Sequence, residues 1–113
     1  MSSMKPRSTA MPNSADVIDY YAEEGRRLAG THFAGDLGPT HSFVLRQPIG
    51  VVAAITPWNF PIAIPSWKIF PALVCGNSVV FKPGEDVPHT ASLFVEILLE
   101  AGLPPEVINL VHG

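Results

Sequence analysis

Two short segments carry side chains whose types and spacing could do chemistry: Thr56-Pro57-Trp58-Asn59 and Lys82-Pro83-Gly84-Glu85. The amide of Asn59 is an uncharged N–H donor that can face a developing oxyanion. Lys82 and Glu85 offer a cation and a carboxylate, which can hold the hydroxyl groups of a ribose. Together these side chains suit a site that binds a nucleotide and stabilises negative charge on oxygen.

The elements that must position these segments alternate between strand and helix from Gly50 onward. The pattern predicts buried strands and crossover helices in this order: Val51–Ile55, a helix over 61–74, Ser78–Phe81, a helix over 88–101, and Val107–Val111. We expect the first strand to be covered on both faces and Pro71 to kink the first helix or break a hydrogen bond in it. Strands joined by helical crossovers form a parallel sheet with right-handed connections.

The fold class predicted is therefore α/β: a partial doubly wound, Rossmann-like parallel sheet of βαβαβ order, preceded by an N-terminal helix and a strand. Residues 1–13 are rich in Ser, Pro and Met and are predicted to form a disordered tail. Residues 14–41 read as a helix, from about Ala15 to Ala29 with Ser14 as its cap, followed by a loop. Residues 42–113 begin with a strand over 42–47 and make up the incomplete sheet domain.

All strands of a parallel sheet end on the same edge, where ligands bind. The two polar segments should therefore lie side by side, with Pro57 and Pro61 stiffening the first of them. Each side chain also has a purely structural alternative. Asn59 could cap the following helix, Trp58 could be a core residue, and Lys82 with Glu85 could be an exposed ion pair worth less than about 1 kcal/mol. No G-x-G-x-x-G follows the first strand, which argues against an ordinary dinucleotide fingerprint.

Composition excludes several classes of protein. The net charge of -3 argues against a nucleic-acid-binding surface, and the single cysteine excludes an internal disulfide framework. The four histidines lack the spacing of a zinc site, so we expect no metal. No apolar run reaches the roughly 18 residues of a membrane-spanning helix, and we predict a cytoplasmic protein without a membrane partner. An apolar fraction of 47% with only 15% charged residues suggests a partner or additional sequence.

Three motifs in this order and spacing resemble the NAD(P)-dependent aldehyde dehydrogenase superfamily. They are PWNFP, PALxxGNxVVxKPxE and EAGxPPxVxNxVxG, and with their flanks they cover residues 42–113, while residues 15–41 resemble the preceding segment of that family more weakly. The resemblance implies oxidation of an aldehyde to an acid. A cysteine thiolate attacks the aldehyde, hydride passes to NAD(P), and a water activated by a glutamate releases the acid.

The resemblance also implies roles for individual residues. Asn59 matches the asparagine whose side chain helps form the oxyanion hole. Lys82 and Glu85 match the residues that bind the adenosine ribose, and the charge of Glu85 favours NAD, with NADP possible. The remaining positions match a segment that lines the cofactor cleft: Ile55, Thr56, Pro57 and Trp58. Gly84 stands where the family usually has Ala or Ser, a departure that puts little in doubt.

The catalytic cysteine, the general-base glutamate and the Gly-rich coenzyme turn of the family all lie beyond the matched segment. Cys75 is not that nucleophile, and we expect it to be a buried structural thiol. The resemblance thus implies the N-terminal part of the coenzyme-binding domain of a homodimeric or homotetrameric enzyme, and an isolated chain without activity. The strand over 42–47 resembles the start of the family's oligomerisation hairpin. The alternatives are a short non-catalytic module that binds nucleotide or docks on full-length paralogues, and a degenerate product that does not fold alone.

Overall fold

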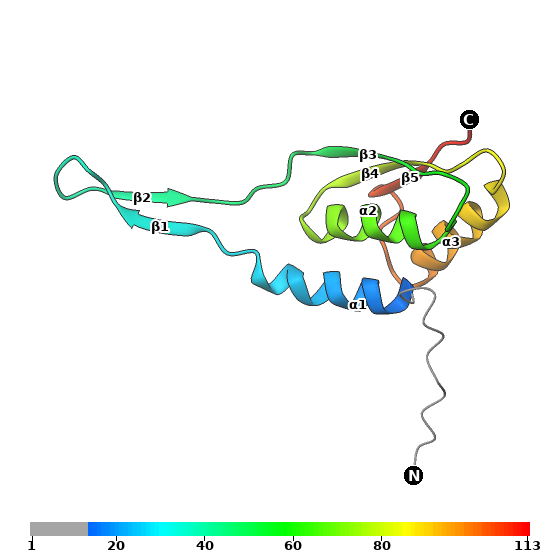
Figure 1. Ribbon diagram of the computed structural model, residues 1–113, viewed down its shortest axis with the longest axis horizontal. Coiled ribbons are helices and arrows are strands. Elements are labelled where there is room, and N and C mark those ends of the chain that lie inside the picture. The colour runs from blue at the N-terminus through cyan, green and yellow to red at the C-terminus, as the bar shows by residue number, and fades with distance from the viewer. Residues whose placement is uncertain (1–13) are drawn as a thin grey trace, which may run out of the picture.

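A three-stranded parallel sheet lies along one side of the helices in the main body of the molecule (Figure 1). The computed structural model describes residues 14–113, so the tail predicted for residues 1–13 lies outside the described part. The strands are β3 (Val51–Ile55), β4 (Ser78–Lys82) and β5 (Ile108–Leu110), in the order β3-β4-β5. Two crossover helices connect them, α2 (Ala63–Val74) and α3 (Pro88–Glu100). The predicted βαβαβ fold is confirmed.

The helices begin and end largely where local sequence signals place them. Pro88 occupies the first turn of α3, where its missing N–H costs nothing. Gly102 follows the helix with φ 104°, and Leu103 N donates to Leu98 O at 3.1 Å, which closes the last turn. Pro71 does not end α2, which continues past it to Val74. Packing of α2 against the sheet and against the N-terminal helix outweighs the hydrogen bond that the proline cannot make.

The core lies between the sheet and its two crossover helices, and β4 runs through its middle. Val79 and Phe81 of β4 and Ile69 of α2 are fully buried, and the Phe81 ring meets the Phe94 ring of α3 edge to face with centroids 6.4 Å apart. The expectation that the first strand is covered on both faces is wrong for the described residues. Val51 and Ile55, which share one face of the strand, are each 68% exposed, while Ala54 on the other face is buried.

An N-terminal helix, α1 (Ser14–Glu24), packs along α2 and passes into a short 3₁₀ turn, η1 (Gly25–Arg27) (Figure 1). The helix is therefore shorter than the predicted span to Ala29. Gly25 explains the change of geometry, because a Cβ there would lie 2.5 Å from Cγ1 of Val74. A glycine at this point lets α1 approach α2 closely, and glycine disfavours continuation of the α-helix.

A β-hairpin projects away from the rest of the molecule (Figure 1). It pairs β1 (Thr31–Ala34) with β2 (His41–Val44) in antiparallel register. The prediction of a loop through residue 41 is thus wrong, and the strand expected over 42–47 is shorter and starts one residue earlier. The glycines of this segment bracket a strand and form its turn, which Gly35 closes by donating its N–H to Thr40 O at 2.8 Å. No helix within residues 14–113 is long and apolar enough to cross a membrane.

Candidate functional site

The carboxyl ends of the three parallel strands meet at one edge of the sheet. We call this edge the strand-end rim and define it as residues 56–59, 82–85 and 111–113. Thr56 N donates to Lys82 O at 3.1 Å, and Val111 N donates to Phe81 O at 2.9 Å, so the ladder continues past the strands. The structure therefore brings the two polar segments side by side, at the place where ligands bind open parallel sheets.

Gly84 and Trp58 join the two segments at their closest point. A Cβ on Gly84 would lie 2.7 Å from N and 2.9 Å from Cα of Trp58. Separations this short do not occur for real Cβ atoms, and the obstacle is backbone rather than a movable side chain. Reasoning from the sequence treated Gly84 as a neutral departure and missed this contact. The sequence around Gly84 does not reveal this contact, because Trp58 follows a different strand of the sheet.

Lys82 and Glu85 form a loose ion pair on the rim. Lys82 Nζ lies 3.9 Å from Glu85 Oε1 and donates to the carbonyl of Pro83 at 3.2 Å. The carboxylate side chain is 75% exposed, so the pair contributes little to folding and both groups remain accessible to a ligand. Gly113 passes over them, since a Cβ on it would lie 2.9 Å from Lys82 Nζ. All three strand ends thus contribute to one polar surface.

Asn59 lies exposed on the rim, and its amide has no hydrogen-bond partner within residues 14–113. The capping alternative is wrong, because Ile62 is the N-cap of α2 and no side chain caps that helix. Trp58 is 63% exposed, so it is not a core residue here. Phe60 follows with φ 55°, the one positive φ outside glycine in the described chain, and its carbonyl accepts a hydrogen bond from Ile64 N at 3.2 Å. A bulky residue in this conformation is an outlier typical of functional loops.

Thr56 is the polar residue most enclosed at the rim. It is 4% exposed, and its Oγ1 is buried without a hydrogen-bond partner in the described chain. A buried hydroxyl without a partner costs free energy, and such groups are few in folded proteins. Ile55, which precedes it, is mostly exposed. Next to Thr56, the accessible ammonium of Lys82 and carboxylate of Glu85 form a donor and acceptor pair that fits a polar ligand such as a nucleotide.

Asn77 fixes the opposite end of the sheet, and the sequence indicated only that the helix before it ends at Gly76-Asn77. It is 9% exposed, and its Oδ1 accepts hydrogen bonds from Ile49 N at 2.8 Å and Gly50 N at 3.0 Å. Its Nδ2 donates to Ala72 O at 3.1 Å. One side chain therefore ties the start of β3 to the end of α2. The Gly76-Asn77 pair was visible as a helix stop, and its side-chain contacts were not.

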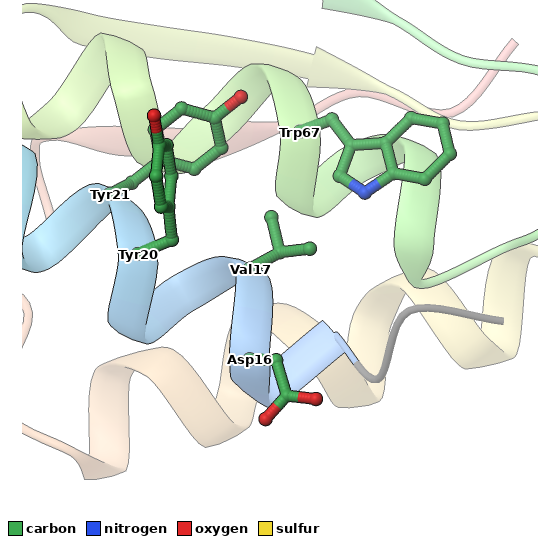
Figure 2. Close-up of a pocket in the computed structure, with 5 residues that line it drawn as sticks. All are labelled: Asp16, Val17, Tyr20, Tyr21 and Trp67. Atoms are coloured by element: carbon green, nitrogen blue, oxygen red, sulfur yellow. The ribbon is translucent and has the colours of Figure 1, made fainter. Parts of the chain in front are cut away.

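A shallow pocket of about 320 Å³ lies between α1 and α2 (Figure 2). It is lined by Asp16, Val17, Tyr20, Tyr21 and Trp67. Figure 2 shows the two tyrosines projecting from α1 toward α2, and the Asp16 carboxylate pointing away from the three rings. The tyrosine rings meet edge to face at 5.4 Å. The pocket therefore offers mainly apolar and aromatic surface.

Cys75 ends α2 and lines a second groove, of about 490 Å³, together with Leu28, Leu45 and Ile49. The thiol belongs to an exposed residue. The expectation that it is buried is wrong, because α2 ends at Val74 and leaves the next residue beyond the covered face. Cys75 lies at the base of the hairpin, far from the strand-end rim.

A parallel βαβαβ sheet of this kind defines part of a Rossmann-like α/β domain. The sequence profile of the Aldehyde dehydrogenase family matches residues 2–113, and the chain belongs to that family. It is 44% identical over 110 residues to the mitochondrial succinate-semialdehyde dehydrogenase of Oryza sativa subsp. japonica, a match that covers 97% of this chain and 21% of that protein. It is 53% identical over 109 residues to the 2-aminomuconic 6-semialdehyde dehydrogenase of a Pseudomonas species, with coverage of 96% and 21%.

Solved structures agree with this assignment. The crystal structure of an NADP-dependent glyceraldehyde-3-phosphate dehydrogenase from Bacillus halodurans C-125, complexed with NADP, superposes with a TM-score of 0.82 at 42% identity. The match covers 88% of this chain and 22% of that one. The chain thus spans about a fifth of the length of the relatives that it matches.

Proposed function

We propose that this chain supplies part of the NAD(P) site and one oxyanion donor of an aldehyde dehydrogenase, as a portion of a longer protein. The reaction is the oxidation of an aldehyde to an acid with NAD(P) as the acceptor. The observation that supports it most is the convergence of Thr56, Lys82 and Glu85, with the exposed Asn59, on one rim. The parent enzyme is expected to be a cytoplasmic homodimer or homotetramer, assembled through the projecting hairpin.

The proposed coenzyme site rests on the types of side chain at the strand-end rim and on their position there. Lys82 and Glu85 would hold the hydroxyl groups of the adenosine ribose, and Ile55, Thr56, Pro57 and Trp58 would line the cleft beside them. When bound, the coenzyme supplies the hydride acceptor. The Glu85 carboxylate would repel a 2′-phosphate, and this favours NAD over NADP. The Bacillus relative binds NADP, so the preference of this chain needs its own measurement.

Asn59 is proposed to stabilise charge on the reacting oxygen. Attack of a nucleophile on an aldehyde carbon moves negative charge onto the carbonyl oxygen, and an aimed N–H donor stabilises that charge more than it stabilises the neutral carbonyl. The Asn59 amide has no partner among residues 14–113 that would compete for this hydrogen bond. The nucleophile and the general base would come from sequence beyond the matched segment, so the 113-residue chain alone should form no NADH from an aldehyde.

The first test is the intact mass of the native protein isolated from its source cells. A species several times heavier than 12.2 kDa that contains these peptides would support the enzyme reading. A species at 12.2 kDa alone would favour the alternative, a short module that binds nucleotide or docks on full-length paralogues. Its excess of exposed apolar side chains, such as Ile49 at 84% exposed, gives that alternative its support.

The second test compares rim variants with matched control variants. All of them are made in the native protein whose mass the first test determines. Lys82→Ala and Glu85→Gln should weaken NAD binding measured by calorimetry, while Lys68→Ala and Glu106→Gln, at exposed positions off the rim, should not. Asn59→Ala should lower kcat by on the order of 100-fold with little effect on NAD affinity, as expected for loss of one oxyanion donor. Asn109→Ala is the matched control. Equal effects of the rim and control variants would overturn the assignment.

A further inference from the structure

The exposed hairpin carries a pair of histidines that the proposed dehydrogenase function does not use. In the register of β1 and β2, His32 lies opposite Phe43, and Ala34 lies opposite His41. Side chains of paired residues point to the same face of a sheet, so these four residues share one face. The small Ala34 leaves room for the imidazole of His41 to lean across toward His32.

The two imidazoles meet through their ring nitrogens. His32 Nε2 lies 2.9 Å from His41 Nδ1, the ring centroids are 5.1 Å apart, and the planes differ by 21°. The Phe43 ring stacks on His32, at 4.6 Å between centroids and 26° between planes. Two paired strands and an aromatic neighbour therefore place the two rings next to each other. No other interaction engages either ring within residues 14–113.

We propose that His32 and His41 form a binding site for a divalent transition metal with a square-planar or octahedral preference, Cu²⁺ or Ni²⁺. Imidazole nitrogens bind such metals at about 2.0–2.1 Å. The register keeps the two rings within reach of one metal ion, since their nitrogens already lie 2.9 Å apart. Among divalent metals, nitrogen sites bind Cu²⁺ most tightly, and Ni²⁺ comes below it in the same order.

Binding requires a small rearrangement of the pair. In the structure the two nitrogens face each other, and one N–H lies between them. In a neutral pair, a change of tautomer moves that N–H to the solvent-side nitrogen of the same ring. Rotation of the rings then points both lone pairs at one metal ion. No proton is gained or lost, and water would fill the remaining coordination positions.

The proposed site has two protein ligands, and no third ligating side chain of the described chain lies beside them. No group of three or more metal-ligating side chains exists within residues 14–113. The metal would join the two strands of an isolated hairpin, which by itself is a weakly stable element. Because the unfolded chain holds the two imidazoles far apart, the metal should bind the paired strands preferentially and stabilise them.

The test is metal binding to the full 113-residue chain without an affinity tag. Cu²⁺ and Ni²⁺ binding are measured by calorimetry, and the nitrogen ligands are counted by electron paramagnetic resonance of the Cu²⁺ complex. Variants are His32→Gln, His41→Gln and the double change, with His89→Gln and His112→Gln as controls at the other two histidines. Circular dichroism checks that each variant keeps the fold of the parent chain.

We expect two equatorial nitrogens in the parent chain and one in either hairpin variant. Each hairpin change should weaken binding by about tenfold or more, because the second imidazole acts at a high effective concentration. The two controls should bind like the parent. The proposal is overturned if the hairpin variants bind like the controls, or if the parent chain shows a single nitrogen. Amide exchange in residues 31–44 gives an independent check, since Ni²⁺ should slow it in the parent and not in the double variant.

Discussion

The α-carbon of Gly84 faces the backbone of Trp58 so closely that a Cβ there would lie 2.7 Å from the Trp58 nitrogen. This contact joins the first and second strand ends and sets the width of the rim on which the proposed coenzyme site depends. Its consequences can be measured without knowing the substrate.

Gly84→Ala should push the two segments of the rim apart. Overpacking against an element that cannot yield costs about 1–3 kcal/mol, so we expect that loss in the free energy of unfolding and weaker NAD binding. Gly102→Ala is the control. Gly102 has φ 104° with open space around it, so its substitution should cost stability through the backbone and leave NAD binding unchanged. A Gly84→Ala protein with the stability and affinity of the parent would show that the segments separate freely.

Asn77→Ala should destabilise the fold strongly, by about 2–4 kcal/mol. The change leaves the N–H groups of Ile49 and Gly50 without their acceptor in a partly buried place, and each such loss costs about 1–3 kcal/mol. Urea unfolding followed by circular dichroism measures it. Asn109→Ala removes only one exposed hydrogen bond, to Glu106 O at 3.3 Å, and should stay within about 0.5 kcal/mol of the parent. Similar midpoints for the two variants would contradict the role assigned to Asn77.

Phe60 offers a test of backbone strain beside Asn59. Both Phe60→Gly and Phe60→Ala delete the ring, but only glycine adopts φ 55° without steric cost. We therefore expect the glycine variant to be more stable than the alanine variant by about 1 kcal/mol. At Phe70 in α2 the order should reverse by a similar amount, since alanine is the better helix former. Thermal unfolding of the four proteins decides the point, and an alanine advantage at residue 60 would show that no strain resides there.

Phe81→Ala should remove about 3–5 kcal/mol, the usual cost of deleting a buried aromatic ring. Phe81 is fully buried in β4 and contacts Phe94. Phe33, on the hairpin, is 51% exposed, and Phe33→Ala should cost far less. Denaturant midpoints compare the two, and a similar loss at both positions would mean that the hairpin is as essential to folding as the core.

The sheet and its crossovers could be predicted because several local signals agreed at each boundary. Pro88 and Gly102 marked the ends of α3, and Gly76-Asn77 marked the end of α2. The parallel topology then placed Lys82 beside Thr56. The first strand of the hairpin, β1, was missed because Gly30, Gly35 and Gly38 suggested a loop throughout, whereas a strand near β2 was predicted. A single sequence does not reveal that two of them bracket a four-residue strand.

Features that depend on contacts between distant segments could not be predicted. Val51, Ala53 and Ile55 lie on the same face of β3 and are all exposed, and whether another element covers that face cannot be read from the run of residues. The same holds for the exposed Cys75, whose position relative to the covered face depends on the residue at which α2 ends. The roles proposed for Asn59 and Glu85 remain predictions that the variants above will test.

The pairing register of the hairpin has a consequence for how its sequence can change. Side chains alternate strictly between faces, with His32 and His41 on one side and Phe33 and Ser42 on the other. Extra residues in the turn would lengthen the tip and leave both sides as they are. One extra residue within β1 or β2 would instead exchange the sides beyond the insertion, unless a bulge absorbed it. Homologous chains should therefore vary in length at residues 36–39 and seldom within the strands.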